Sequence, residues 1–577
     1  MIRILKNFKW YYWLMLALML LIIVGQVQLD LIVPEYMSQI VSLVTTPGSE
    51  MSEIWRVGLI MIACAFGSLV CTVLASFIAA RMAAGFAELL RDKVFRKVES
   101  FSMNEINKFS TASLITRCTN DVQQIQMFIT IGLRLLITAP IMAIGAIVKM
   151  SGKSGELTLL TFAGVLVIVV FVLFIYIVAV PRFKSIQKLT DRINKVTREN
   201  LTGLRVVRAY NAEAYQEEKF DKANTAVTKT YLFVNRVLSL MQPVMQIVMN
   251  GLSLGIVWLG AMLINTNALE LPTMMSFTMY SMQVILSFLM LIMVFIFMPR
   301  ASVSSKRINE VLSTKNIIND PETPAADTGI KGELEFRNVS FKYPDGDGYV
   351  LKDISFKAEK GQTVAIIGST GSGKSSLLNL IPRFYDVTEG EVLVDGVNVK
   401  EYRQEELHDK IGYVPQKAVL FSGTVDSNLR FGKEDATREE LAKAVKIAQA
   451  NNIIEKKGYG GNVAQGGQNM SGGQKQRMSI ARAIVKNPEI YLFDDSFSAL
   501  DYKTDRLLRE AINKNIKDAT NIIVAQRIGT IKNADRILVL DDGRVVGDGT
   551  HEELLANCSV YQEIAHSQLS KEELANG

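Results

Sequence analysis

Long apolar runs dominate the first half of the chain. Six of these runs are each about long enough to cross a bilayer as a helix, which takes about 20 residues. They cover residues 10–33, 54–80, 128–150, 157–180, 244–264 and 272–298. From Gly332 onward, polar and apolar residues alternate in short blocks, which is typical of a soluble α/β domain. The pattern therefore predicts a membrane domain followed by a soluble domain.

Basic side chains predict how the membrane domain is oriented. The first apolar run has no small-residue cleavage site and is too long for a signal-peptide core, so we interpret it as a retained span. Basic residues gather after the second run (Arg81, Arg91, Lys93, Arg96, Lys97, Lys108 and Arg117) and after the fourth (Arg182, Lys184, Lys188, Arg192, Lys195, Arg198, Arg205 and Arg208). Because basic loops stay in the cytoplasm, both stretches and the N-terminus are predicted to be cytoplasmic.

The same two basic stretches contain few helix breakers, so their helices are predicted to continue beyond the membrane as a stalk. A polar segment around Pro321 and Pro324 predicts a linker. We therefore expect a transmembrane domain over residues 1–312, a linker over 313–331, a soluble domain over 332–570 and a polar tail over 571–577.

Composition adds little to this division. The chain has 577 residues and a net charge of +6, which is modest for its length and does not indicate nucleic-acid binding. Its four cysteines are Cys64, Cys71, Cys118 and Cys558. They lack the spacing of a metal site and do not indicate a disulfide framework.

A phosphate-binding loop is the first sign of chemistry in the soluble domain. Its residues fit the pattern G-x-x-x-x-G-K-S between an apolar strand at 363–367 and a helical run at 376–380: Gly368, Ser369, Thr370, Gly371, Ser372, Gly373, Lys374 and Ser375, with Ser376 next. Glycines let backbone N–H groups wrap phosphates, Lys374 supplies a positive charge, and the Ser375 hydroxyl can bind magnesium. ATP with Mg²⁺ is the expected ligand.

Two elements downstream extend this motif. Residues 490–494 form an apolar strand that ends in Asp494, which suits a magnesium contact at the phosphate end of a parallel sheet. A buried strand with a capping aspartate is the alternative interpretation. Between the loop and this strand lies the sequence Met470, Ser471, Gly472, Gly473, Gln474, followed by a helical run.

That sequence resembles the LSGGQ signature of ATP-binding cassette (ABC) proteins, with Met470 in place of leucine. Other parts of the family's pattern follow in order. The resemblance implies that Tyr343 stacks on adenine, that Gln416 is the Q-loop residue and a magnesium ligand beside Ser375 and Asp494, and that residues 498–501 are the D-loop ending in Asp501. A kinase or a RecA-like ATPase would lack both the SGGQ sequence and the six spans.

The membrane half resembles ABC exporters. Residues 109–124 and 199–210 look like the two intracellular loops, which in this family carry short coupling helices that dock on the nucleotide-binding domains. A merely solvated basic stalk is the alternative. The resemblance implies an all-α, six-helix type I exporter transmembrane domain followed by an α/β P-loop nucleotide-binding domain.

The resemblance also implies a dimer. In the family, each ATP lies between the P-loop of one cassette and the signature of another, so Ser471, Gly472, Gly473 and Gln474 would serve a second chain. Two catalytic positions depart from the family pattern: Asp495 stands where glutamate is usual, and Gln526 replaces the switch histidine. These departures are similar to the degenerate-site subunit of bacterial heterodimeric multidrug exporters. A homologous partner with the usual residues is therefore expected.

The predicted activity is ATP-driven export of hydrophobic or amphipathic compounds across the bacterial cytoplasmic membrane. A slow homodimeric exporter or lipid flippase, and a nucleotide-gated regulatory subunit, are the alternatives. Gln26, Gln28 and Asp30 are candidates for lining the transport cavity, although Asp30 near the outer end of its span could simply reach the interface. Methionines of the sixth span could contact cargo, or only pack: Met274, Met275, Met279, Met282, Met290, Met293 and Met298.

Overall fold

The computed structural model describes residues 4, 6, 8–326 and 328–568, and the chain divides into two compact units. The first unit contains the chain up to Glu99 together with Ala112–Ser313. The second contains Ser100–Thr111 and the chain from Thr314 onward. The expected tail at 571–577 lies outside the described residues.

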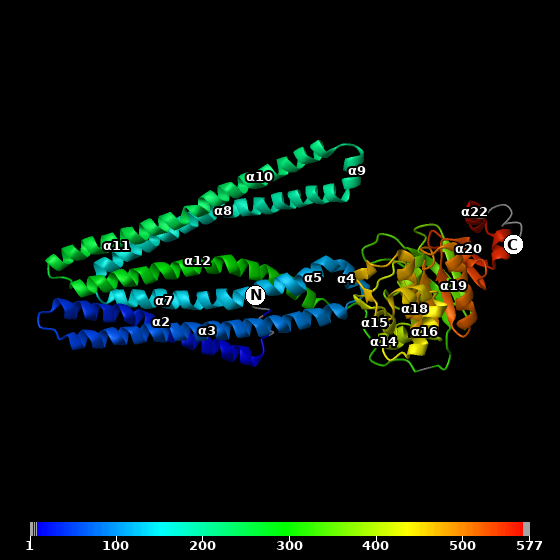
Figure 1. The fold of residues 1–577 in the computed structure, drawn as a ribbon, viewed down its shortest axis with the longest axis horizontal. Coiled ribbons are helices and arrows are strands. Elements are labelled where there is room, and N and C mark those ends of the chain that lie inside the picture. Colours follow the sequence, from blue (N-terminus) through cyan, green and yellow to red (C-terminus); the bar gives the residue numbers. More distant parts are fainter. Residues whose placement is uncertain (1–3, 5, 7, 327, 569–577) are drawn as a thin grey trace. The chain divides into compact units, whose positions relative to one another are not determined.

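The first unit is helical (Figure 1). Its elements are α2 (Trp10–Thr45), α3 (Met51–Glu99), α5 (Thr111–Thr116), η1 (Arg117–Asp121), α6 (Val122–Met127), η2 (Phe128–Gly132), α7 (Leu133–Ser151), α8 (Gly155–Thr202), α9 (Leu204–Ala209), α10 (Glu213–Ser239), α11 (Met241–Asn265) and α12 (Leu271–Ser313). Among the described residues, six helical stretches are long and apolar enough to span a membrane, and each coincides with one of the predicted runs. The prediction of six spans is confirmed.

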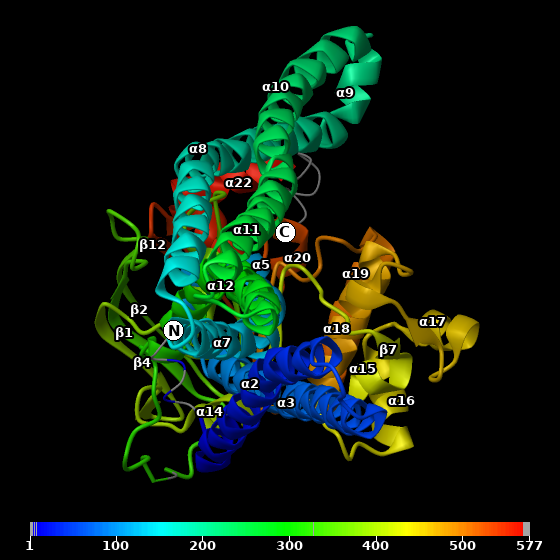
Figure 2. The same cartoon turned by 90° about the vertical axis from the view of Figure 1, so that its left-hand side faces the viewer.

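As predicted, α3 and α8 continue as helices far beyond their apolar runs, to Glu99 and Thr202. Within this unit, α2 lies along α3, and α8 lies beside α10 with α9 at the end of the pair (Figures 1 and 2). The apolar face of α2 packs into a core that includes Phe277 and Tyr280 of α12.

The first helix is longer than predicted. It continues through Pro34 to Thr45, whereas the expected span ended at residue 33. Proline has no N–H to donate to the carbonyl four residues earlier, which here belongs to Asp30. The Gln283 amide of α12 donates to that carbonyl instead, at 2.9 Å. Asp30 therefore lies inside α2 rather than at its end.

The first intracellular loop also differs from the expectation. Its short helix is α4 (Met103–Phe109), while the residues from Thr111 onward, most of the expected loop, begin the third long helix. A capping box between Ser102 and Glu105 starts α4, and Ser110, with a φ of 59°, ends it. In the second loop, α9 lies within the expected range.

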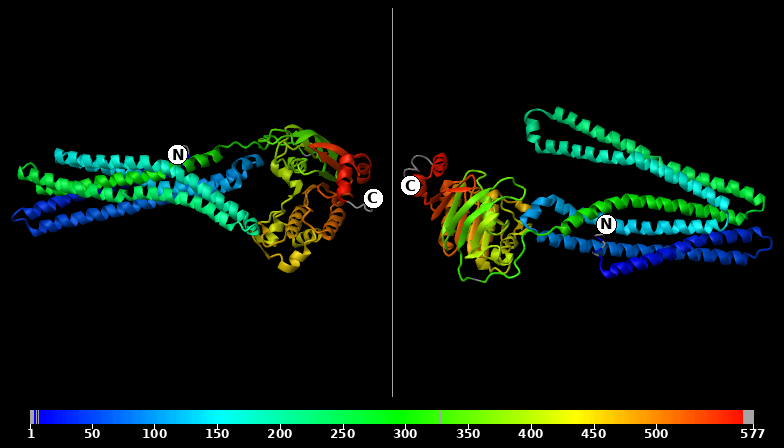
Figure 3. Two further views of the ribbon diagram at one scale, coloured as in Figure 1. Left: turned by 90° about the horizontal axis from the view of Figure 1, so that it is seen from above. Right: turned by 180° about the vertical axis from the view of Figure 1, so that it is seen from behind.

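The second unit contains two main sheets (Figure 3). An antiparallel sheet has the order β2-β1-β4-β5, with β1 (Leu334–Phe341), β2 (Leu351–Ala358), β4 (Glu389–Val394) and β5 (Val397–Asn398). A mostly parallel sheet has the order β12-β11-β3-β10-β9-β6, with β3 (Thr363–Gly368), β6 (Ile411–Val414), β9 (Ile490–Asp494), β10 (Thr520–Val524), β11 (Arg536–Asp541) and β12 (Arg544–Gly549). A short pair joins β7 (Gly423–Thr424) to β8 (Asn462–Val463).

Helices complete the second unit, and the central strands are buried beneath them. Besides α4, the helices of this unit are α13 (Lys374–Leu380), α14 (Gln404–Asp409), α15 (Val425–Arg430), α16 (Arg438–Ile447), α17 (Asn451–Lys457), η3 (Gln465–Gly467), α18 (Gly472–Lys486), α19 (Tyr502–Asn515), α20 (Ile528–Ile531), α21 (His551–Asn557) and α22 (Ser559–Gln568). Every residue of β9 and β10 is buried. Burial on both faces explains why these strands are apolar without alternation.

A buried ionic network joins the third long helix to α12 in the first unit. Asp121 of η1, which is 6% exposed, accepts a hydrogen bond from the Ser304 hydroxyl at 2.8 Å and pairs with Arg307 at 3.2 Å. Arg117, one turn earlier, donates to the Arg307 carbonyl at 2.6 Å and to Glu310 at 2.9 Å. The charges satisfy one another, so the network fixes the spacing of the two helices.

Replacing Asp121 with leucine should therefore destabilise the helical unit. The change leaves the Ser304 hydroxyl and the Arg307 guanidinium without their acceptor, and we expect a loss of about 2–3 kcal/mol. The measurement is the Tm of the detergent-solubilised protein. The exposed Asp92, which pairs with Arg96, provides the control: Asp92→Asn should leave the Tm unchanged. Equal effects of the two substitutions would contradict this account.

Candidate nucleotide-binding site

The predicted phosphate loop connects β3 to α13 at the carboxyl end of the parallel sheet. Gly371 and Gly373 have φ values of 89° and 99°, which side-chain-bearing residues rarely adopt. A Cβ atom at Gly373 would also lie 2.7 Å from Leu351 Cδ2 and 3.0 Å from the Val350 carbonyl oxygen. The loop therefore needs glycine both for its turn and for its close packing.

Lys374 points its ammonium group back into this loop. Its Nζ donates to the carbonyl oxygens of Gly368 at 2.9 Å and Ser369 at 2.7 Å, and to Ser372 Oγ at 3.3 Å. Burial lowers the pKa of Lys374, while the nearby carboxylates of Asp495 and Asp494 oppose that shift. The loop thus holds a positive charge at the position where a polyphosphate would bind.

Ser375 and Asp494 provide oxygen atoms beside the loop. The Ser375 hydroxyl donates to Asp494 Oδ1 at 2.9 Å. Burial raises the pKa of Asp494, and repulsion from Asp495 raises it further. The hydrogen bond from Ser375 and the charge of Lys374 lower this pKa and so oppose the effect of burial. A divalent cation would offset the cost of burying the Asp494 charge. A hydroxyl with a carboxylate is also the kind of donor set that Mg²⁺ takes alongside phosphate oxygens and water. These two residues therefore fit a magnesium site.

Asp495 brings the two unusual catalytic positions into contact. It follows β9 with a φ of 45°, and its backbone N–H donates to the Val524 carbonyl at 2.9 Å. Its Oδ2 accepts from Gln526 Nε2 at 3.0 Å and from Gln416 Nε2 at 3.3 Å. One carboxylate oxygen is thus bound by two amides. Gln416, the expected magnesium ligand, turns its amide nitrogen toward Asp495.

Tyr343 lies beside the first turn of α13. Its hydroxyl is 2.9 Å from Ser376 Oγ, and its ring meets Phe341 and Tyr385 edge-on, with centroids 4.8 and 5.2 Å apart. Asn107 of α4 donates to the Tyr385 hydroxyl at 3.0 Å. The expected adenine-stacking ring is therefore held in place by other aromatic rings near the phosphate loop.

The signature residues form a separate feature at the start of α18. Ser471 Oγ accepts from the Gln474 N–H at 3.4 Å, and Gln474 Oε1 accepts from the Ser471 N–H at 3.0 Å, which makes a capping box. A Cβ at Gly472 would meet nothing within 4 Å, and one at Gly473 would lie 3.2 Å from the Ala499 carbonyl oxygen. No hydrogen bond among the described residues joins the signature to the phosphate loop.

Asp501 is also apart from the phosphate loop. It caps α19, where its carboxylate accepts from the Thr504 N–H at 2.9 Å and the Thr504 hydroxyl at 2.7 Å. The backbone hydrogen bond from Thr504 lowers the pKa of Asp501. The structure therefore gathers Lys374, Ser375, Asp494, Asp495, Gln416 and Gln526 in one site, with Tyr343 beside Ser376, and places the signature and Asp501 elsewhere.

Three residues that were not predicted from the sequence support this site. Gln476 of α18 donates to the Pro415 carbonyl at 3.2 Å, next to Gln416. Ser496 donates to the Val414 carbonyl of β6 at 2.9 Å, and Gln568 of α22 donates to the Gln526 carbonyl at 2.8 Å. Gln476 could have been noticed in the sequence, because it is a polar residue on the buried face of α18. Nothing in the local sequence marks Gln568.

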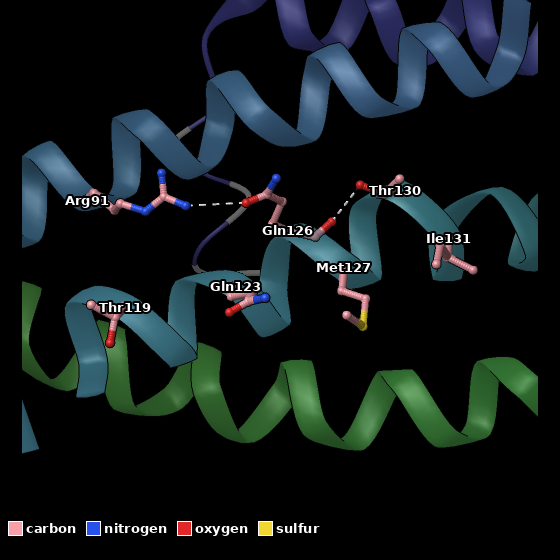
Figure 4. Close-up of a pocket in the computed structure, with 7 residues that line it drawn as sticks. All are labelled: Arg91, Thr119, Gln123, Gln126, Met127, Thr130 and Ile131. Atoms are coloured by element: carbon pink, nitrogen blue, oxygen red, sulfur yellow. Dashed lines mark hydrogen bonds between the residues drawn. The ribbon is translucent and has the colours of Figure 1, made fainter. Parts of the chain in front are cut away.

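A hollow of about 500 Å³ lies on the helical unit, outside every predicted site residue (Figure 4). Arg91 of α3 faces the third long helix there, and its Nη2 donates to Gln126 Oε1 at 3.4 Å. The other lining residues are Thr119, Gln123, Met127, Thr130 and Ile131, which follow the segment that contains η1 and η2. This polar face is part of the helical extension.

Comparisons with known proteins agree with both halves. Residues 14–288 match the model of the ABC transporter transmembrane region, and residues 351–498 match that of the ABC transporter. An uncharacterised ABC transporter ATP-binding protein of Mycobacterium tuberculosis is 41% identical over 523 residues, 90% of each chain. A probable multidrug resistance ABC transporter ATP-binding/permease protein of Bacillus subtilis is 34% identical over 481 residues, 82% of each chain. A solved bacterial Atm1-family ABC exporter with ATP bound has a TM-score of 0.80 and 26% identity, and the match covers 96% of this chain and 98% of that one.

The geometry of the phosphate loop predicts that Gly373→Ala will weaken ATP binding by about tenfold or more, since strained backbone of this kind costs on the order of 1–3 kcal/mol. The measurement is equilibrium binding of a fluorescent ATP analogue to the purified chain. Gly472→Ala is the matched control, because Gly472 has an ordinary φ and open space around it. Similar affinity in the two variants would show that the loop tolerates a side chain.

Proposed function

The chain belongs to the ABC transporter family as an exporter-type half-transporter, and we propose that it forms one subunit of a heterodimeric exporter whose own ATP site hydrolyses slowly. It is a multi-pass membrane protein with an ABC ATPase domain. The contact that supports the proposal most directly is that of Gln526 and Gln416 with the same oxygen of Asp495.

The phosphate-loop geometry supports nucleotide binding by the chain itself. Backbone N–H groups of residues 368–373 and the ammonium of Lys374 would hold the phosphates, and Tyr343 would support the base. Ser375 and Asp494 would hold Mg²⁺, which offsets phosphate charge when it is bound. ATP supplies the phosphoanhydride bond whose cleavage drives transport.

Hydrolysis at this site requires a base that reaches the attacking water. Asp495 is one methylene shorter than the glutamate usual in the family, and its Oδ2 is bound by two amides on the protein side. A misplaced base reduces the rate on the order of 10²-fold, and complete loss of base assistance on the order of 10²- to 10⁴-fold. These losses correspond to about 3–5 kcal/mol in the barrier. Gln526 retains hydrogen bonding but not the charge of an imidazolium.

The signature supports a role toward another chain. Ser471 and Gln474 cap α18 by themselves, and Gly472 is open to approach. In the proposed dimer, this signature completes the partner's site, where the usual glutamate and histidine perform hydrolysis. The N-terminus and the nucleotide-binding domain face the cytoplasm, in keeping with the basic stretches that follow the second and fourth spans.

The proposed cargo is a hydrophobic or amphipathic compound. Met275, Met279, Met282, Met290 and Met293 share one face of α12, and each of them is at least partly exposed. Flexible thioether side chains suit a surface that accepts varied shapes. Met274 lies on another face, buried against Gly260 of α11, and has a packing role.

ATPase measurements test the asymmetry. The chain should be purified alone and together with the proposed homologous partner, and robust turnover should appear only in the mixture. In the mixed transporter, Asp495→Asn here should leave most of the activity, whereas glutamate to glutamine at the partner's catalytic position should abolish it. Equal losses from both substitutions would refute the asymmetric mechanism.

A gain-of-activity variant tests whether Asp495 and Gln526 limit hydrolysis at the chain's own site. The double substitution Asp495→Glu with Gln526→His supplies the missing base and the charge, and we expect it to raise the ATPase activity of the chain alone on the order of 10²-fold. The single Gln526→His should give much less, because the base remains misplaced. Fast turnover by the unmodified chain alone, unchanged in the double variant, would instead indicate a competent homodimer.

A further inference from the structure

A cluster of polar side chains lies inside the apolar part of the helical unit. Gln26 and Asp30 are one turn apart on the same face of α2, Ser68 belongs to α3, and Gln283 belongs to α12. The Ser68 hydroxyl donates to Asp30 Oδ1 at 2.5 Å, and Gln283 Nε2 donates to the Asp30 carbonyl at 2.9 Å. Three helices therefore bring these groups together around Asp30.

Hydrogen-bond acceptors outnumber donors in this cluster. Gln26 is only 9% exposed, and neither its Oε1 nor that of Gln283 accepts a hydrogen bond from any residue that the structure describes. The Asp30 carboxylate has the Ser68 hydroxyl but no ion pair within the described part of the chain. Buried acceptors without donors are unfavourable, most of all where lipid replaces water. The cluster has room for one more hydrogen-bond donor, and a cationic donor would suit it best.

Cations on neighbouring elements are already engaged. Glu35, the next acid along α2, pairs with Lys149 of α7 at 2.8 Å. Lys153 donates to Ser276 at 3.3 Å and lies over the Tyr280 ring, 5.5 Å from its centroid. Glu35 is thus a neutralised acid of the same helix, whereas Asp30 is not.

An apolar face borders the cluster. On α12, Met279, Gln283 and Met290 follow one another at spacings of four and seven residues, which places them on one side of the helix. Met279 and Met290 belong to the methionine face described above. A carboxylate and two amide oxygens therefore adjoin a flexible thioether surface.

We propose that the cluster around Asp30 binds the protonated amine of an amphipathic cargo, with the apolar part of the cargo on the methionine face. The inference rests on the proposed export function and assigns a substrate class to it. The ammonium would donate to the Asp30 carboxylate and to Gln26 Oε1 and Gln283 Oε1, the two amide oxygens that the described residues leave without a donor. A charged donor to a carboxylate forms a stronger hydrogen bond than a neutral one.

The test compares two probes that differ only in their polar group. Pyrenemethylamine is cationic at neutral pH, and pyrenemethanol is neutral. Binding is measured by fluorescence, and ATPase stimulation is measured in parallel, with the assembled transporter in liposomes. We expect the amine to bind about tenfold or more tighter than the alcohol, and Asp30→Asn to remove that preference while leaving alcohol binding unchanged.

Two further variants keep the test decisive if Asp30→Asn does not assemble. Gln26→Leu fills the same buried space without an acceptor and should reduce the amine preference several-fold. The double variant Glu35→Gln with Lys149→Met removes an acid of the same helix together with its cation, and should retain the full preference.

Equal affinity for the two probes in the unmodified transporter would overturn the inference, as would an equal loss of both in Asp30→Asn. Competition by Na⁺ without any amine preference would also overturn it, since the ligand would then be an inorganic cation. These results leave basal ATPase intact, whereas an assembled transporter without ATPase activity would refute the proposed function instead.

Discussion

The in-register parallel pairing of β3, β10 and β9 is the constraint on which the nucleotide site depends. Val524 of β10 lies opposite Ile366 of β3 and Asp494 of β9, so the three strands end at one edge of the sheet. The chain that leaves each strand must turn at that edge, and the turns carry the phosphate loop, Asp495 and Gln526. Residues far apart in the sequence meet there because the strands fix their ends, as the hydrogen bond between Ser375 and Asp494, 119 positions apart, illustrates.

A different constraint governs the helical unit, where polar groups buried between helices need partners from other helices. The backbone gap opened by Pro34 is closed by Gln283, and the charges of Arg117 and Asp121 are balanced by residues of α12. In both places α12 supplies the hydrogen-bonding or charged partner that another helix lacks. The sixth long helix therefore acts as the common support of the unit, at its apolar end and in its polar extension.

Much of this architecture could be predicted from the sequence because it depends on local sequence patterns. Apolar length predicts the six spans, and the loop from Gly368 to Ser375 predicts its own strand and helix. Strand ends then predict that Asp494 and Asp495 lie near Lys374. Local pattern failed where a distant residue decided the outcome: Pro34 looks like a helix end until Gln283, 253 positions from Asp30, replaces the missing donor.

The position of α4 could have been predicted, because Ser102 and Glu105 form a recognisable capping box. The contact of Gln568 with Gln526 could not, since it depends on how α22 folds back onto the domain.

The capping box at Ser471 and Gln474 has a consequence for assembly. Both of its hydrogen bonds are formed within one chain, so the signature loop is ordered before any second cassette approaches. Association then has little conformational entropy left to remove from this loop. The chain can present a rigid half of an interface, and the strength of pairing becomes a question of contact chemistry rather than of folding upon encounter.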